Sequence, residues 1–313
     1  MNPEQKIYIA GHRGLVGSAI TRYLIRHSYR NLVTATSEEV DLREQSDVRA
    51  FFRKHNPECV IIAAAKVGGI LANNTYPADY FFDNLMIAVN IIDAAYHDGV
   101  KKLLFLGSTC VYPRLSPQPL KEEYLLTGPL EPTNEWYAVA KIAGIKMCQA
   151  YRRQYGSRFI AAMPTNLYGP EDNFDLDTSH VMPALIRKFY EAKINRLPEV
   201  TVWGSGKPCR EFLHVDDLAD AVVFLMQNYD GEEAINIGVG KDIPIVDLAE
   251  TIKEIVGYTG AITFDSSKPD GTPRKLVDTS LINSMGWAPK ISLKEGIKST
   301  VEWYQRQQVH NYA

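Results

Sequence analysis

The residues best suited to chemistry in this sequence are a tyrosine, a lysine, a serine and a cysteine. Tyr137 and Lys141 stand four residues apart, so on a helix their side chains would share one face, about one turn apart. The lysine ammonium is then expected to lower the pKa of the phenol, so that the tyrosine transfers a proton near neutral pH. Ser108 would hold a substrate oxygen with a second hydroxyl. Cys110 is the unusual member, because hydride transfer needs no thiol, and it should distinguish this protein from its relatives.

A glycine-rich segment near the N-terminus predicts a dinucleotide site. It follows an apolar run, Ile7–Ala10, and it opens a helical pattern. Gly11 would allow a tight turn, Gly14 would let a pyrophosphate approach the backbone, and Gly17 would let the helix pack on the strand. The N-terminus of that helix presents N–H groups and a positive dipole end to phosphates. The predicted cofactor loop comprises Gly11, His12, Arg13, Gly14, Leu15, Val16 and Gly17.

The next apolar run indicates which dinucleotide is bound. NAD-binding proteins usually place an acidic residue after the second strand, to hold the ribose hydroxyls. Here the run over residues 32–36 has no acid until Glu38, while Arg13 and Ser37 could bind a 2′-phosphate. Both residues favour NADP, although Arg13 could instead be a solvated surface arginine. Asp41 and Leu42 are placed for contacts with the adenine edge, and a role in capping a nearby helix is the alternative.

Short apolar strands alternate with amphipathic helices through the first half of the chain, and this alternation must position those side chains. The strands are nearly continuous in apolar residues, as in strands that are covered on both faces. The alternation predicts an α/β fold, with a Rossmann-type doubly wound parallel sheet. The predicted strands cover residues 7–10, 32–36, 60–65, 103–106 and 159–163, and the helices cover 16–27, 47–55, 78–97 and 136–155.

After residue 164 the sequence changes to loops rich in Pro, Asn and Asp, with fewer regular patterns. Helices are expected over residues 181–192, 214–226, 246–256 and 293–306, and a late strand over 234–237. We therefore predict an NADP-binding domain over residues 1–165, to which 211–240 return, and a smaller C-terminal substrate-binding lobe made of 166–210 and 241–313.

Composition narrows the class of protein. The net charge of −3 gives no basic footprint for nucleic acid. The N-terminus leaves no room for a signal peptide before the first strand pattern, and no apolar run is long enough to span a bilayer. The four cysteines form neither a CxxC pair nor a metal-ligand cluster, which predicts no metal site and a reducing, cytoplasmic location.

Ser108, Tyr137 and Lys141 match the catalytic trio of the short-chain dehydrogenase/reductase superfamily, in its extended, nucleotide-sugar branch. Within that branch the sequence closely resembles the GDP-L-fucose synthase family, nearly from end to end. Some members carry a basic residue where Ser37 stands, so the NADP preference depends mainly on Arg13. The segments that carry this resemblance are residues 11–17, 63–70, 73–79, 132–135, 164–170, 210–217 and 268–275.

The resemblance implies an enzyme that uses NADPH for 3,5-epimerisation and 4-reduction of GDP-4-keto-6-deoxy-D-mannose. Cys110 and His180 match the family's acid–base pair, and modest perturbation would bring both pKa values near 7. Tyr137 and Ser108 would stabilise an enolate and then assist reduction. Which of the thiol and the imidazole is the base stays open. Cys110 could instead be a small buried hydrophobe and His180 a helix cap, while His214 is expected to be structural.

The resemblance also implies the ligand contacts and the assembly. Lys141 would bind the nicotinamide ribose, and Lys188 stands beside Arg187, so only one of them can easily face a ligand. A homodimer through the helices at residues 78–97 and 136–155 is implied by analogy. Other implied cofactor contacts are Leu106, Gly107, Pro164, Asn166, Leu167 and His180, and the substrate contacts are Asn166, Lys188, Trp203, Arg210 and Asp270. The alternatives are another extended nucleotide-sugar 4-epimerase or 4-reductase, and a dinucleotide sensor without activity.

Overall fold

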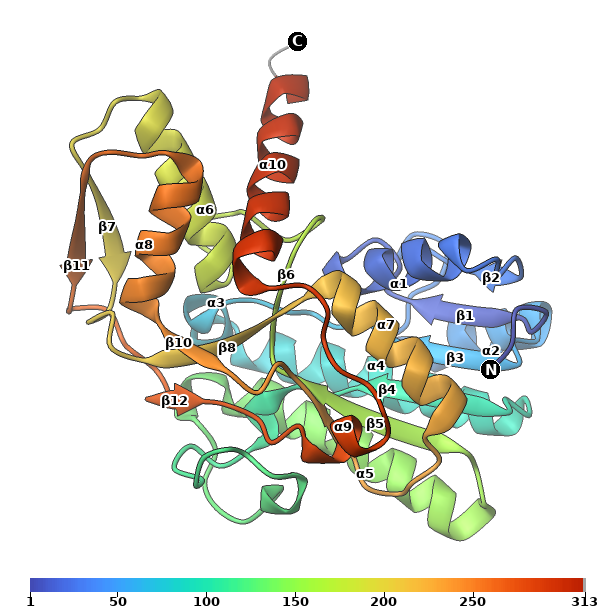
Figure 1. Ribbon diagram of the computed structural model, residues 1–313. Coiled ribbons are helices and arrows are strands. Elements are labelled where there is room, and N and C mark those ends of the chain that lie inside the picture. The colour runs from blue at the N-terminus through green and yellow to red at the C-terminus, as the bar shows by residue number, and fades with distance from the viewer. Residues whose placement is uncertain (312–313) are drawn as a thin grey trace.

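A six-stranded parallel sheet forms the centre of the computed structural model, which describes residues 1–311 (Figure 1). Its strand order is β2-β1-β3-β4-β5-β9, with every neighbouring pair parallel. The order reverses direction beside β1, as in doubly wound sheets. The strands are β1 (Ile7–Ala10), β2 (Leu32–Val33), β3 (Cys59–Ile62), β4 (Lys102–Leu106), β5 (Phe159–Pro164) and β9 (Ile235–Ile237).

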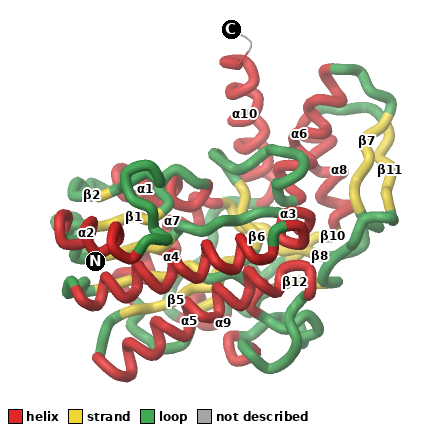
Figure 2. The backbone as a smooth tube through the Cα atoms, turned by 180° about the vertical axis from the view of Figure 1, so that it is seen from behind, coloured by secondary structure: helices red, strands yellow, loops and turns green. Residues whose placement is uncertain are grey.

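Helices cover both faces of this sheet, which confirms the predicted fold class (Figure 2). α1 (Leu15–Arg26) and α7 (Val215–Asn228) pack together over one face. The other face is covered by three helices that pack on one another: α2 (Gln45–His55), α4 (Pro77–His97) and α5 (Glu135–Tyr155).

The side chains of β1 explain why the strands read as continuous apolar runs. Ile7 and Ile9 belong to the core beneath α1 and α7, while Tyr8 and Ala10 belong to the core beneath α2, α4 and α5. All four are at most 1% exposed. Because successive side chains point to opposite faces and both faces are buried, no position in the strand can be polar.

After β5 the chain leaves the large sheet. β6 (Asn166–Tyr168) pairs with β8 (Cys209–His214), which also pairs with β10 (Asp242–Pro244) and β12 (Arg274–Lys275). Between β8 and β10 the chain returns to the large sheet through α7 and β9. This second sheet therefore joins the carboxyl ends of the large sheet to the C-terminal part of the chain.

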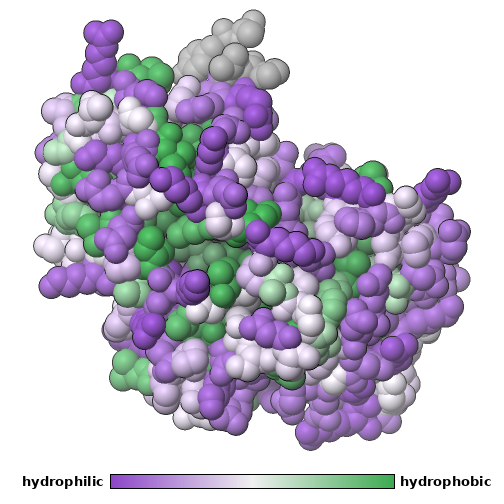
Figure 3. All heavy atoms as spheres, in the orientation of Figure 1, coloured by the Kyte–Doolittle hydropathy of each residue, from purple (hydrophilic) through white to green (hydrophobic). Residues whose placement is uncertain are grey.

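The upper part of the molecule in Figure 1 is a smaller lobe with its own apolar core. It contains α6 (Val181–Ile194), α8 (Ile245–Val256) and α10 (Leu293–Asn311), with β7 (Glu199–Trp203) paired to β11 (Ala261–Asp265). In Figure 3 hydrophobic residues gather in the recess where this lobe meets the rest of the molecule. Two short helices, α3 (Ile70–Thr75) and α9 (Ser280–Ser284), lie in the connections.

The predicted helices and strands of the large sheet are present with ends shifted by a few residues, and β2 is shorter than expected. The short strands β6, β7, β8, β10, β11 and β12 were not predicted. They have two to six residues and pair with distant segments, so their sequences carry little local signal. Among the described residues no helix is long and apolar enough to cross a bilayer, and none form a group of three or more acidic, His or Cys side chains placed to hold a metal.

Candidate active site

The glycine loop has the geometry of a phosphate cradle. Gly11 has φ +85°, and the Gly14 N–H donates to its carbonyl at 3.1 Å. A Cβ on Gly17 would lie 2.0 Å from that same carbonyl oxygen, so a side chain cannot fit there. α1 begins at the next residue after Gly14 with no side-chain cap, which leaves N–H groups of its first turn open to an anion. The loop therefore fits a dinucleotide pyrophosphate.

Arg13 and Ser37 are exposed at the same edge of the large sheet. Hydrogen bonds from Thr36, together with the nearby Arg13 and His12 charges, lower the pKa of the Glu39 carboxyl. Glu39 accepts the Thr36 N–H at 2.7 Å, which fixes the loop after β2, and the effect of Arg13 and His12 on the same carboxyl places the glycine loop nearby. The two loops can therefore bind one 2′-phosphate together, and Arg13 would supply the positive charge.

Asp41 and Leu42 are already engaged within the protein. The Asp41 carboxylate accepts the Arg43 guanidinium at 2.7 Å, which holds the pKa of that carboxyl at about 2. The Leu42 carbonyl accepts the Asn90 amide at 3.1 Å. These contacts favour a role in fixing the loop, which leaves the side chain of Leu42 as the part able to meet an adenine.

Tyr137 and Lys141 share one face of α5, as their spacing predicted. The Lys141 Nζ lies 5.8 Å from the centre of the Tyr137 ring and donates to the Leu106 carbonyl at 2.8 Å, at the end of β4. Burial lowers the pKa of Lys141 to about 8. The strand end thus fixes the lysine, and the helix fixes the tyrosine above it.

The expected effect of the lysine on the phenol is not what the structure gives. Burial raises the pKa of Tyr137 well above its ordinary value, and Cys110 raises it further. Lys141 does not offset this, because its ammonium is itself penalised by burial and points to Leu106. The prediction from helical spacing placed the two residues correctly but ignored the desolvation of both.

Ser108 and Cys110 follow β4 in a tight turn that opens a short 3-10 helix (Thr109–Val111). The Ser108 Oγ accepts the Cys110 N–H at 3.3 Å. Cys110 is only 6% exposed, yet it lines a pocket. Burial raises the pKa of its thiol, and Lys275 opposes that rise. The expected pKa near 7 is therefore wrong, because desolvation outweighs the nearby cations.

His180 occupies the N-cap position of α6, but its side chain makes no capping hydrogen bond. His180 is an exposed residue, yet desolvation by the surrounding protein atoms lowers its pKa, and the Lys275 charge lowers it too. The turn before His180 is bound to the loop between β3 and α3, since the Gly69 N–H donates to the Thr178 carbonyl at 2.8 Å. His180 is thus held in place with its ring free to act. By contrast, His214 caps α7, with its Nδ1 accepting the Asp216 N–H at 3.2 Å.

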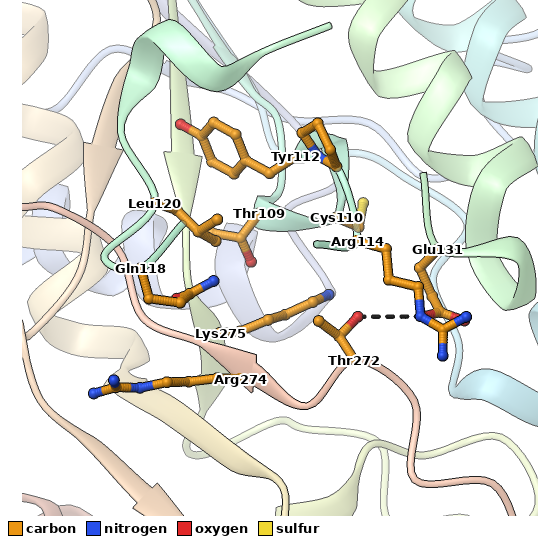
Figure 4. A pocket seen from close by; sticks show the side chains of 11 residues that line it. Thr109, Cys110, Tyr112, Arg114, Gln118, Leu120, Glu131, Thr272, Arg274 and Lys275 are labelled. Atoms are coloured by element: carbon orange, nitrogen blue, oxygen red, sulfur yellow. Dashed lines mark hydrogen bonds and ion pairs between the residues drawn. The ribbon is translucent and has the colours of Figure 1, made fainter. Parts of the chain in front are cut away.

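A pocket beside Cys110 lies between the turn after β4 and the segment that contains β12 (Figure 4). Cys110 and its turn line one side of the pocket. The loop before β12 and β12 itself line the other side. Glu131 is 6% exposed, and its carboxylate accepts Arg114 at 3.1 Å and the Thr272 hydroxyl at 3.4 Å. The other labelled side chains are Thr109, Tyr112, Gln118, Leu120, Arg274 and Lys275.

Lys188, rather than Arg187, faces the predicted substrate contacts. The Lys188 Nζ donates to the Thr201 carbonyl at 3.0 Å and lies 5.2 Å from the centre of the Trp203 ring. Arg187 pairs with Glu191 at 2.7 Å instead. Trp203 is 44% exposed, so one edge of its indole remains open to a ligand.

Arg210 and Asp270 meet through the backbone. The Arg210 guanidinium donates to the Asp270 carbonyl at 3.2 Å, while the Asp270 carboxylate accepts the Ser205 N–H at 2.7 Å and its hydroxyl at 2.8 Å. Burial lowers the pKa of Arg210. The Asp270 side chain therefore shapes a loop, and Arg210 is the group with donors left for an anion.

The remaining predicted contacts lie where β5 passes into β6. Pro164 ends β5 beside Ile237, and Leu167 pairs with Leu213. The Asn166 amide donates to the Glu211 carbonyl at 2.8 Å. Leu106 and Gly107 stand at the end of β4, next to β5. These residues lie at the carboxyl end of the large sheet, where ligands of doubly wound folds bind.

Three residues at the site were not singled out from the sequence. Glu131 and Lys275 line the pocket with Cys110, and the Lys268 Nζ lies 5.2 Å from the Trp203 ring. Lys275 and Lys268 belong to a segment that carried the family resemblance, but nothing in their spacing shows that they approach Cys110 and Trp203. That approach depends on β12 pairing with β8.

Comparison with known proteins identifies the family. Residues 7–238 match the model of the NAD dependent epimerase/dehydratase family. The chain is 62% identical over 300 residues to a probable GDP-L-fucose synthase 1 of Oryza sativa subsp. japonica, a match that covers 96% of this chain and 92% of that protein. The chain belongs to the GDP-L-fucose synthases within that family. The resemblance inferred from its segments is therefore confirmed.

Two solved structures extend the comparison beyond GDP-L-fucose synthases of plants. A GDP-L-fucose synthetase from Naegleria fowleri bound to NADP has a TM-score of 0.91 and 31% identity, covering 99% of this chain and 96% of that one. A GDP-mannoheptose C4 reductase from Campylobacter jejuni with NADP bound has a TM-score of 0.91 and 42% identity, covering 97% and 99%. The fold is thus shared by synthases and by reductases of GDP-sugars.

Proposed function

We propose that this protein converts GDP-4-keto-6-deoxy-D-mannose to GDP-L-fucose, by epimerisation at C3 and C5 followed by reduction at C4 with NADPH. The observation that carries the proposal is the Cys110 thiol in a pocket beside the Tyr137 phenol, with His180 at the start of α6. A simple reductase has no need of the thiol. The identity of 62% to a probable GDP-L-fucose synthase supports the same conclusion.

The cofactor is NADPH, as the NADP-bound relatives and the glycine loop indicate. When bound, it supplies the hydride for C4. In our proposal the open N–H groups of α1 hold its pyrophosphate, and Arg13 and Ser37 hold its 2′-phosphate. Lys141, fixed by the Leu106 carbonyl, holds the nicotinamide ribose.

Epimerisation uses the acidity of carbons next to a carbonyl. A base removes the proton from C3 or C5, the C–H bond breaks, and its electron pair moves to O4 as an enolate. A proton delivered to the opposite face of the carbon restores the carbonyl and inverts the centre. Cys110 and His180 divide these two roles. The hydroxyls of Tyr137 and Ser108 hold O4 while it is negative.

Reduction uses the same oxygen. O4 needs a proton as C4 becomes a carbinol, and Tyr137 donates it. A phenol whose pKa is raised by burial stays protonated until charge develops on O4, so the raised pKa suits a donor. Arg210 and Lys188 hold the GDP moiety, and Trp203 lies beside its guanine. Asn166 and the loop shaped by Asp270 complete the substrate-binding residues.

Deuterium exchange tests the epimerisation. The protein is incubated with the keto sugar in D2O, and deuterium at C3 and C5 is read by mass spectrometry. Cys110→Ser is expected to abolish this uptake, whereas Cys209→Ser, which changes a thiol on β8 that bonds to the Lys207 carbonyl, is expected to retain it. Uptake at the normal rate in Cys110→Ser would remove the thiol from the mechanism. No loss of NADPH absorbance with this substrate would overturn the proposed function.

A GDP-sugar 4-reductase is the second candidate, favoured by the 42% identity to a GDP-mannoheptose C4 reductase. The same assay distinguishes the two, because a 4-reductase consumes NADPH without any exchange at C3 or C5. The buried thiol beside Tyr137 favours the synthase, since a reductase would have no chemical use for it.

We also propose that two copies associate through α4 and α5. Large hydrophobic side chains on these helices are exposed in the single chain, with Phe82 at 56%, Trp136 at 50% and Tyr155 at 48%. Trp136→Glu is expected to give a monomer by sedimentation, because it would bury a charge at the interface. Leu115→Glu, at a position 83% exposed in another loop, is the control and is expected to stay dimeric.

The division of the chain and its location are proposed on similar grounds. We assign residues 1–165 with 211–240 to NADP binding, supported by α7 and β9 on the large sheet, and 166–210 with 241–313 to substrate binding. Four free cysteines support a reducing location such as the cytoplasm.

A further inference from the structure

Lys275 projects into the pocket beside Cys110 from the end of β12. It pairs in register with Arg210 on β8, so the two cations are neighbours on adjacent strands. In Figure 4 its side chain extends across the pocket, and its nitrogen end is directed to the side where Thr272 and Cys110 lie. Among the described residues its ammonium makes no hydrogen bond or ion pair, which is unusual for a cation so enclosed.

The charges around Lys275 do not neutralise it. Arg210 faces it from β8 and is also positive, and His180 faces it from the start of α6. Among the described residues, the carboxylate that acts on Lys275 is Glu131, which already accepts Arg114 at 3.1 Å. The remaining ionisable group that faces it is the thiol of Cys110.

Cys110 in turn faces few other charges. From α5 it faces Lys141, whose ammonium is bound to the Leu106 carbonyl, and Tyr137, whose phenol is neutral. Lys275 has the largest effect of any neighbouring charge in lowering the pKa of the thiol, although burial outweighs it. An enclosed ammonium without a partner costs free energy, so we expect a cation kept here to serve an anion, and the Cys110 thiol is the unpaired ionisable group in the same pocket that can become one.

We propose that Lys275 is the counter-charge of the Cys110 thiolate and governs epimerisation through that thiol. The proposal rests on the proposed function, in which the thiol works at C3 and C5. The thiol proton leaves to water as the thiolate forms beside the ammonium. The thiolate then takes the proton from carbon, an S–H bond replaces the C–H bond, and the electron pair passes to O4. Lys275 is thus a positioning residue that sets the charge of its neighbour.

The same cation also acts on His180. A positive charge favours the thiolate and disfavours the imidazolium, so Lys275 lowers the pKa of both groups. The pair is thereby biased toward a thiolate and a neutral imidazole. The imidazole N–H proton goes to the opposite face of the enolate carbon, and it is replaced through water by the proton that the thiolate took from the substrate. Without Lys275, both groups would hold their protons to higher pH.

The test measures the thiol directly. The rate at which iodoacetamide alkylates Cys110 is followed by peptide mass spectrometry from pH 6 to pH 11 in the full chain, without any sugar nucleotide. Because burial raises the pKa of this thiol, the shift in midpoint between variants is read from the displacement of the rising limb of each profile. In Lys275→Met the midpoint of the profile is expected to rise by about one to three pH units, the usual effect of removing an opposite charge. Lys275→Arg, which keeps the charge, is expected to stay near the natural midpoint. Lys241→Met removes an exposed lysine of the same lobe and is the control.

An unchanged midpoint in Lys275→Met, with the fold intact by circular dichroism, would overturn the proposal. Lys275→Gln is the second neutral variant and decides the question if the methionine variant does not fold. If Lys275 had only a structural role, Lys275→Met would lower stability without shifting the pH profile of alkylation. Lys275→Arg would then restore stability and leave the midpoint where it was. Because no substrate is present, failure here is separate from failure of the proposed function, which the deuterium exchange tests.

The exchange assay gives a second reading. Deuterium uptake at C3 and C5 in Lys275→Met is expected to fall at least about tenfold at neutral pH, in line with the smaller thiolate fraction, and to recover as the pH rises. Uptake that is equal to the natural rate at every pH would also contradict the proposal.

Discussion

The two ends of the active site are built differently. At the cofactor end the ligand groups are backbone N–H groups of one continuous segment, and glycines clear the space before them. At the sugar end the groups are side chains: Cys110 after β4, Tyr137 on α5, His180 before α6 and Lys275 on β12. Distant segments must fold correctly before this second site exists.

The charges at the two ends differ as well. Arg13 and Ser37 at the cofactor end are exposed, and water screens them. At the sugar end burial shifts almost every titratable group toward its neutral form, raising the pKa values of Cys110 and Tyr137 and lowering those of His180 and Lys275. Burial therefore opposes charge on each of these groups, so the charge that one of them carries depends on its neighbours. We therefore expect the sugar end to be more sensitive to single side-chain changes.

Tyr137→Phe should give the largest effect, because the phenol serves every step at the sugar end. Removing it takes away the proton donor and one of the donors to the enolate, so kcat should fall by about 10³-fold, within the usual range for a general acid. Deuterium exchange should fall with it. NADPH binding, measured by fluorescence titration, should be almost unchanged. Loss of NADPH binding would contradict the separation of the two ends.

Gly17→Ala tests the cofactor end. Its Cβ would lie 2.0 Å from the Gly11 carbonyl oxygen, so the turn must open. Overpacking of this kind costs about 1–3 kcal/mol, which corresponds to about 5- to 150-fold weaker NADPH binding if the cost falls on the bound form. Gly99→Ala, where no heavy atom lies within 4 Å of the added Cβ, is the control for a glycine substitution away from this loop and should leave NADPH affinity unchanged. Normal NADPH affinity in Gly17→Ala would show that the loop is not the binding site.

Arg210→Leu tests the outer part of the sugar end, where the GDP is held. A hydrogen bond to a charged group contributes about 1.5–3 kcal/mol, so KM for the GDP-sugar should rise about 10- to 100-fold with a smaller change in kcat. Arg274→Leu is the control, because that arginine pairs with Asp242 on the neighbouring strand. A fall in kcat at constant KM would instead assign Arg210 to the chemical step.

The smallest expected effect is that of Lys141→Met on the free energy of unfolding. Burial lowers the pKa of Lys141 from 10.5 to about 8, so between these values the unfolded chain holds the proton more tightly than the folded chain does. The stability cost of the lysine is therefore complete below pH 8 and disappears as the pH rises toward 10.5. In the protein without cofactor, Lys141→Met should gain about 1–2 kcal/mol at pH 7, after the lost bond to the Leu106 carbonyl is counted.

Denaturant midpoints at pH 7 and pH 10 measure this gain. The difference between Lys141→Met and the natural protein should shrink at the higher pH, and activity should be low at both. A gain that stays constant with pH would mean that the methionine stabilises by packing rather than by removing a buried charge.

Sequence patterns predicted much of the large sheet, because strands covered on both faces are apolar throughout and their helices are amphipathic. The same reasoning missed β7, although Glu199–Trp203 alternates exposed and buried residues, since five residues are too few for a firm pattern. It placed Tyr137 beside Lys141 but gave the wrong direction for the phenol pKa. Spacing along a helix fixes which side chains are neighbours, whereas desolvation depends on everything that packs around them.

The sequence by itself determined the glycine turn, the Tyr137 and Lys141 pair on one helix face, and the alternation that gives a doubly wound sheet. Each depends on residues close together in the chain, whose geometry the backbone fixes. Only the tertiary structure decided that Lys275 faces Cys110 and His180, and that Asp270 supports a loop while Arg210 keeps free donors. Those contacts arise where β12 pairs with β8, and no local pattern in either segment reveals that pairing.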